Sequence, residues 1–150
     1  MKMLAQEPEH YLGFMTSNPS LNEEHKEYRN VIIMRDILRQ ACEIYKNRVT
    51  GTATRESSIE SVEKLRQSAL ELSSENAGSH ALVWPFFIAA AESIELDHRT
   101  FFFEQLGKLF PCTRFGTIPM ALDTLTYIWA SADSVSWVDI MTKQRPLLIM

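Results

Sequence analysis

The sequence is poor in the residues that build tight β-turns. It contains only 5 glycines, and neither Asn-Gly nor Asp-Gly occurs. Two-residue hairpins depend on such dipeptides, and no long stretch alternates between apolar and polar residues. No two glycines stand close enough to form a phosphate-binding loop. The scarcity of glycine therefore argues against a β-rich fold and against a glycine-rich nucleotide site.

Cysteine is almost absent as well. The chain has 2 cysteines, Cys42 and Cys112, and no histidine lies within a few residues of either. A closely spaced four-ligand zinc site is therefore excluded. A disulfide between the two thiols and a pair of free thiols both remain open, although nothing indicates an oxidising compartment.

Basic runs and long apolar runs are missing too. The 19 acidic residues outnumber the 15 basic ones, for a net charge of -4. Direct binding of nucleic acid needs a concentrated basic surface, so we expect none from this chain. The longest apolar run, Phe86 to Ala91, is far too short to span a membrane. The N-terminus lacks the continuous apolar core of a signal peptide. These absences predict an intracellular soluble protein without membrane partners.

Helical periodicity is what the sequence has in abundance. After a flexible segment over residues 1–20, a first helix is expected, with Ser20 and Glu23 as a capping box. It should end near Thr50-Gly51-Thr52. A second helix is expected to begin at Ser57, with Glu60 completing its capping box, and a polar loop should follow over residues 73–80. The apolar stripes of these two helices are Met34, Ile37, Leu38, Ala41, Ile44 and Tyr45, and then Ile59, Val62, Leu65, Ala69 and Leu72.

Three further helices and a short last one are predicted. The third has Pro85 in its first turn or is kinked by it. The fourth runs from about residue 97 to 110 and is ended by Pro111, and Pro119 opens the fifth. The last surrounds Trp137. Residues 21–150 thus predict an all-α, irregular multi-helix bundle of about five to six helices. The third and fourth helices are apolar nearly all round, which indicates a missing portion, a dimer partner or a ligand tunnel. The apolar residues of the third to fifth helices are Trp84, Phe87, Ile88 and Ala91, then Phe101, Phe102, Leu106 and Leu109, then Ala121, Leu122, Leu125, Ile128 and Trp129.

Side chains able to do chemistry are scattered. Glu-x-x-His, which supplies two ligands in di-metal helical bundles, occurs at Glu7/His10 and at Glu95/His98. Such a site also needs two more inward-facing glutamates, and we expect the available ones to lie off the apolar faces. No serine lies in a G-x-S-x-G turn. We therefore predict no catalytic residue, no metal site and no cofactor. The other residues considered are Glu43, Glu63 and Glu71 as outward-facing glutamates, Cys42 as a small hydrophobic residue beside the core, Cys112 as an exposed thiol, and His80 and His98 as capping or loop residues.

The apolar pattern of the second half resembles the fungal-specific transcription factor domain. The matching stretches are "HALVWPFFIAAAES", "DHRTFFFEQLGKL", "GTIPMALDTLTYIW" and the tryptophan of "VSWVDIM", with "IIMRDILRQACEIYKNRV" upstream. The resemblance covers about residues 25 to 150, and it rests mostly on packing residues. It implies a non-enzymatic, helical regulatory domain that acts in the nucleus.

The resemblance has two departures. Family members usually begin with a basic six-cysteine zinc cluster, and this chain has none, so it is not expected to read DNA in their way. The family's regulatory region is usually longer, so the chain resembles its C-terminal part.

We expect the domain to act through a protein partner, a second copy of itself or a small-molecule effector. Phe86 and Phe103, opposite the main apolar stripes, are the predicted partner or ligand surface, while Trp84 and Trp129 are predicted core residues. The alternative hypotheses are a stand-alone helical protein that binds a small molecule in an aromatic pocket and, third, a di-metal or thiol enzyme.

Overall fold

The computed structural model describes residues 19–72, 79–113, 117–131 and 136–144, and within them every regular element is helical. The predicted all-α fold is therefore confirmed. The N-terminal segment, the 73–78 loop and the apolar C-terminal residues lie outside the described residues, and the predicted boundary near residue 20 stays a prediction. The elements are α2 (Pro19–Thr50), α3 (Arg55–Leu70), the 3-10 turn η1 (Ser79–Leu82), α4 (Val83–Glu92), α5 (Leu96–Thr113), α6 (Thr117–Ala130), α7 (Trp137–Asp139) and the π-helical turn η2 (Ile140–Gln144).

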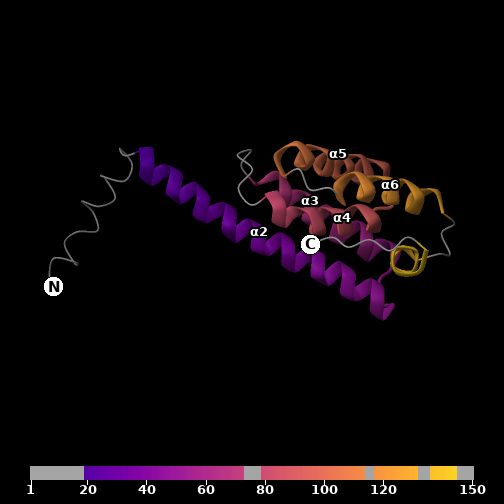
Figure 1. Cartoon of the computed structure of the whole chain (residues 1–150). Coiled ribbons are helices and arrows are strands. Elements are labelled where there is room, and N and C mark those ends of the chain that lie inside the picture. The colour runs from indigo at the N-terminus through magenta and orange to yellow at the C-terminus, as the bar shows by residue number, and fades with distance from the viewer. Residues whose placement is uncertain (1–18, 73–78, 114–116, 132–135, 145–150) are drawn as a thin grey trace.

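Helix α2 is the longest element and the base on which the others pack. Its 32 residues span about 48 Å at 1.5 Å per residue. Figure 1 shows α3 to α6 gathered over its C-terminal half, while its N-terminal half extends beyond them. The helix ends as predicted at Thr50, because Gly51 adopts a positive φ of 77°. The backbone N–H of Thr52 then donates to the carbonyl of Asn47 at 3.0 Å, which satisfies a carbonyl that the helix leaves open.

The start of α3 differs from the prediction. The helix begins at Arg55 and its N-cap is Thr54, not Ser57. The Ser57 backbone N–H donates to Oγ1 of Thr54 at 3.1 Å, and the Thr54 N–H donates to Oγ of Ser57 at 2.9 Å. A serine at the third helical position thus does what Glu or Gln usually does there. The Ser57–Glu60 box is wrong because Thr54 satisfies the free amides one turn earlier. The side chains of Ser20 and Glu23 lie outside the described residues.

Two prolines behave differently from each other. Pro85 lies in the first turn of α4 and the helix continues through it, because the missing N–H would have no partner there. The prediction that Pro111 ends the fourth helix is wrong, since α5 runs on to Thr113. In the last turn a proline removes one hydrogen bond and leaves the next two residues free to stay helical.

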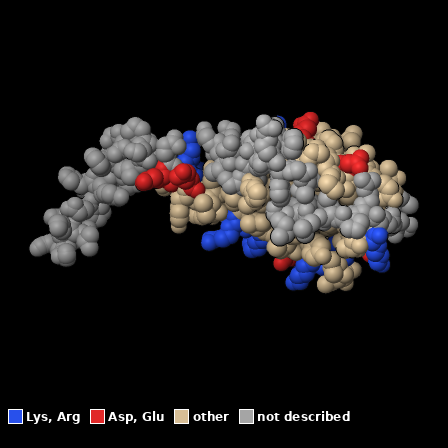
Figure 2. All heavy atoms as spheres, in the orientation of Figure 1, with Lys and Arg blue, Asp and Glu red and all other residues tan. Residues whose placement is uncertain are grey.

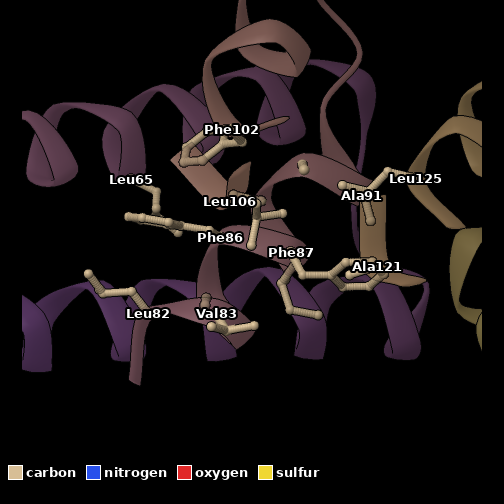
Figure 3. Packing of buried hydrophobic residues seen from close by; sticks show 14 of the residues in the cluster. Leu65, Leu82, Val83, Phe86, Phe87, Ala91, Phe102, Leu106, Ala121 and Leu125 are labelled. Carbon is tan, nitrogen blue, oxygen red and sulfur yellow. The ribbon is translucent and has the colours of Figure 1, made fainter. Parts of the chain in front are cut away.

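Helix α4 is the centre of the core. It packs against α2, α3, α5 and α6, and all its residues are buried except Trp84, which is half-buried. A helix that is apolar all round is stable only when neighbours cover every side. Figure 3 shows Phe86 and Phe87 of α4 among core residues of neighbouring helices, with Phe86 toward Phe102. The buried apolar residues of the other helices include Ile33, Ile37, Ala41, Ile44, Val62, Leu65, Phe102, Leu106, Leu109, Ile118, Ala121, Leu125, Ile128, Trp137 and Ile140.

Candidate functional site

A carboxylate lies at the junction of four helices. The side chain of Glu92, the last residue of α4, is only 2 % exposed. It accepts hydrogen bonds from Arg48 Nε at 3.0 Å and Arg48 Nη2 at 2.7 Å, from Trp137 Nε1 at 2.7 Å, and from the Ser58 hydroxyl. These donors come from α2, α7 and α3. Every direction around the carboxylate is therefore taken by a donor, as a buried charge requires.

Arg48 neutralises this carboxylate through a two-pronged contact. Both of its donating nitrogens bind one oxygen each, the geometry in which a guanidinium and a carboxylate interact most strongly. The hydrogen bond to Glu92, with its negative charge, raises the pKa of Arg48 above the ordinary value. Arg48 Nη2 also lies 3.4 Å from the Ser58 oxygen. With charge and hydrogen bonds both matched, the Glu92 cluster is suited to joining helices and not to proton transfer.

A second polar cluster surrounds Glu63 on α3. Arg66 Nε and Nη2 each donate to it at 3.0 Å, Gln67 Nε2 donates at 2.6 Å, and His98 Nε2 lies 2.8 Å from Oε1. Since a carboxylate only accepts, His98 Nε2 carries the hydrogen. Hydrogen bonds from Arg66, Gln67 and His98 lower the pKa of Glu63 from 4.5 to about 2. Glu63 and Arg66 are half-buried, whereas the sequence predicted an outward-facing Glu63.

The Glu-x-x-His motifs form no metal centre in the described part of the chain. His98 is buried and contacts Glu63, while Glu95 is exposed. Among the described residues, no three His, Cys, Asp or Glu side chains are grouped to hold a metal ion. Glu7 and His10 lie outside the described residues. The prediction that His98 makes a capping or loop hydrogen bond is wrong, because its imidazole binds a glutamate side chain on another helix.

Two surface pockets flank this second cluster. One, of about 520 Å3, is lined mainly by charged side chains of α3 and α5, with Phe101 as its aromatic member. The other, of about 690 Å3, lies on the outer face of α3 and contains no aromatic residue. Neither is the aromatic-lined pocket that the small-molecule hypothesis requires, so that hypothesis stays a prediction.

The remaining candidate residues that the structure describes do not come together in one site. Cys42 is exposed, so its predicted place beside the core is wrong: the helix turns it to the side opposite Ile37 and Ile44. The side chain of Cys112 lies outside the described residues. Glu43 and Glu71 are exposed, as predicted, and His80 is also exposed.

The two phenylalanines predicted as a partner surface differ from each other. Phe86 is only 3 % exposed, and its ring lies 5.7 Å from that of Phe102. The face of α4 opposite its main stripe is covered by α5, so Phe86 presents almost no surface. Phe103 is half-buried, with its ring 6.0 Å from that of Trp129. Partner binding at Phe103 stays a prediction. Trp84 and Trp129 pack against the core and are half-buried.

An apolar surface does exist, on α2. Tyr28, Val31 and Val49 are exposed large apolar residues on this helix, and Tyr45 is partly covered, with its ring 6.3 Å from those of Trp84 and Trp137. Together with Leu38 they stand three, seven, seven and four residues apart, spacings that keep them on one helix face. We call this the outer face of α2.

Sequence reasoning overlooked the Glu92 cluster. Glu92 follows an uninterrupted apolar run within a helix that is apolar all round, and a charged residue in such a helix must find a partner. That signal was present in the sequence. The sequence did not indicate which residues donate to Glu92, because Arg48 and Trp137 are 44 and 45 positions away from it.

The class of protein follows from these features. It is an all-α scaffold whose buried charges join helices and whose largest helix leaves an apolar face uncovered. Residues 4–150 match the fungal specific transcription factor domain, and the chain belongs to this family. The match reaches further toward the N-terminus than the expected 25–150. No curated protein and no solved structure matches the chain.

Family membership gives the chain a role in the regulation of transcription, and the family is a regulatory domain and not an enzyme. The setting implied by this role is the nucleus. In the part of the chain that the structure describes, no helix combines the length and apolarity needed to cross a bilayer.

Proposed function

We propose that this domain regulates transcription in the nucleus by contacting another protein through the outer face of α2, without catalysis and without binding DNA itself. One observation carries the proposal. Val31 is 58 % exposed in a row of apolar side chains on a helix whose opposite side is anchored in the core. Several exposed apolar side chains on one helix face are typical of interaction sites.

The helix is well suited to present such a surface. Its core side is fixed by Ile37, Ala41 and Ile44, which are buried, and its C-terminal end by Arg48 in the Glu92 cluster. A rigid, pre-ordered helix loses little conformational entropy on binding. A partner that lies along it would therefore meet a formed surface.

A tethering assay tests this function. The full chain is fused to a heterologous DNA-binding domain, and the output of a reporter gene is compared with that of the DNA-binding domain alone. We expect the fusion to change the output, and Val31→Asp to abolish the change while circular dichroism remains that of the unaltered chain. Met120→Asp is the matched control, since Met120 is 55 % exposed on α6. No change in output, or equal loss in both variants, would contradict the proposal.

A further inference from the structure

The outer face of α2 has a regular seven-residue pattern. Its positions step by three and four residues, as in helices that pair along a seam: Tyr28, Val31, Arg35, Leu38, Cys42, Tyr45 and Val49. Leu38 is half-buried and the other six are exposed. The core-facing residues Ile33, Ile37, Ala41 and Ile44 occupy the other side of the same helix. One helix thus carries an occupied seam and a largely exposed one, in which only Leu38 and Tyr45 also contact or approach the rest of the described chain.

The charges beside the exposed seam are basic over most of its length, while the exposed Glu24 and Glu27 lie on the same face before Tyr28. From Tyr28 to Thr50, helical geometry places Arg35, Arg39 and Lys46 on or next to it, and all three are exposed. The acidic residues of this stretch, Asp36 and Glu43, project to the flank. Asp36 there accepts hydrogen bonds from Arg39 and from Gln40 Nε2, the latter at 2.9 Å. Several Lys and Arg side chains project from the lower edge of the molecule in Figure 2, the edge that α2 follows in Figure 1.

This charge pattern disfavours a second copy of the chain as the occupant. Parallel pairing of two α2 helices would place Arg35 against Arg35 inside the seam. Antiparallel pairing centred near Leu38 would place Arg39 beside Arg39. Like charges across a helix pair are destabilising, and neither arrangement brings an acidic residue opposite a basic one.

The charge pattern also disfavours nucleic acid as the occupant of this face. The basic side chains stand among Val31, Leu38 and Val49, which offer nothing to a phosphate. A duplex backbone is held by many closely spaced cations, and the seam supplies three.

We propose that the outer face of α2 binds an acidic amphipathic helix of a partner protein. The apolar side of that helix would lie on Tyr28, Val31 and Val49, and its carboxylates would meet Arg35 and Lys46. Helix-in-groove recognition uses apolar anchors at this spacing, and complementary charge sets partner choice and association rate. The inference rests on the proposed function and specifies the chemistry of the partner.

The probe for this inference is a fluorescent synthetic peptide about three heptads long, with leucine at both seam positions and glutamate beside them. A second peptide carries lysine in place of every glutamate. Fluorescence anisotropy with the full chain should show that the glutamate peptide binds and that added salt weakens it. The lysine peptide should bind at least about tenfold more weakly.

Charge-reversed variants locate the site. Arg35→Glu combined with Lys46→Glu should weaken the glutamate peptide at least about tenfold and strengthen the lysine peptide. Lys64→Glu combined with Lys108→Glu makes the same change in net charge at exposed positions of α3 and α5 and should leave binding unaltered. Circular dichroism checks that each variant stays folded.

Several results would overturn the inference. Equal binding of both peptides, or equal effects of both double variants, would mean that the face does not select acidic helices. A dimer in analytical ultracentrifugation that Val31→Asp dissociates would make a second copy the occupant. If a labelled DNA duplex binds the chain through Arg35 and Lys46, the occupant of the outer face is nucleic acid. If the reporter assay still depends on Val31 while the glutamate peptide fails to bind, the proposed function stands and only this inference falls.

Discussion

Two carboxylates of this domain, Glu92 and Glu63, each bind an arginine, yet their surroundings differ in nearly every respect. The Glu92 side chain is 2 % exposed and that of Glu63 is 39 % exposed. Glu92 takes its donors from three other helices, while Glu63 takes two of its three from its own helix, at Arg66 and Gln67. The ion pair of Glu63 is therefore local, whereas that of Glu92 holds distant parts of the chain together.

The comparison shows that the number of hydrogen bonds is a poor guide to what a charged residue contributes. Water can replace the partners of Glu63, because its side chain reaches the surface. Nothing replaces those of Glu92, so loss of any of them leaves a charged or polar atom buried without a partner. Substitutions in the two clusters should therefore separate by size of effect.

The largest effect is expected from Glu92→Ala. Removing the carboxylate leaves the Arg48 guanidinium without its charged partner, and breaking a buried ion pair from one side costs about 3–5 kcal/mol. Because the Arg48 side chain is 30 % exposed, water can partly replace the carboxylate, and the loss should lie toward the lower end of this range. Urea unfolding followed by circular dichroism measures this loss. In the Arg48→Met, Glu92→Leu double variant both charges are gone, and much of the stability should return. A loss below about 1 kcal/mol for Glu92→Ala would show that the cluster does not join the helices.

A smaller effect is expected from Trp137→Phe. The substitution keeps most of the ring and removes the N–H that donates to Glu92, and a hydrogen bond to a charged group contributes about 1.5–3 kcal/mol. Trp129→Phe is the matched control, because Trp129 Nε1 donates at 3.1 Å to the neutral carbonyl of Ala90. It should cost about 0.5–1.5 kcal/mol. Equal losses in the two variants would mean that a hydrogen bond to the Glu92 carboxylate contributes no more than one to a neutral carbonyl.

The contribution of Glu63 to stability should depend on pH. Its pKa lies at about 2 in the folded chain and at 4.5 as the ordinary value, so the unfolded chain binds the proton first as the pH falls. The stabilisation by Glu63 is therefore fully present above about pH 4.5 and is lost as the pH falls from there toward about 2. Melting temperatures over this range should fall less steeply for Glu63→Gln than for the unaltered chain. Glu60→Gln, exposed on the same helix, controls for the loss of one charge, and the same slope in all three would contradict the prediction.

The smallest effect is expected from Arg39→Ala. Arg39 pairs with Asp36 at the exposed surface of α2, where such pairs contribute about 0–1 kcal/mol and are screened by salt. Urea unfolding should show a change within about 0.5 kcal/mol. A loss as large as that of Trp137→Phe would mean that exposure does not separate the clusters.

What the sequence could predict was decided by whether a signal is local. The stripes containing Val62, Leu106 and Leu125 are confirmed because burial imposes helical periodicity on the chain itself. The stripe containing Ile37 is confirmed only in part, since Leu38 and Tyr45 lie on the outer face of α2. The start of α3 was predicted wrongly because both Thr54 and Ser57 can cap a helix. Only the backbone conformation shows that Thr54 is the N-cap. The prediction that Phe86 belongs to an exposed surface was wrong because α5 covers it. The sequence of α4 does not reveal where α5 packs.

The candidate site was harder to predict than the fold. Periodicity alone assigns Val31 and Tyr45 to an apolar side of α2, but not which apolar residues the rest of the chain leaves uncovered. The donors of Glu92 converge only after α2, α3, α4 and α7 have packed.

The Glu92 cluster also has a consequence for the order in which the domain can mature as it is synthesised. Arg48 and Ser58 leave the ribosome well before Glu92, but Trp137 emerges 45 residues after it. Until then one oxygen of a buried carboxylate has only one of its two donors, so the nascent domain holds an incomplete centre through nearly a third of its translation. A chain stopped before Trp137 should accordingly be recognised by chaperones and proteases as unfinished, even with α2 to α6 already made.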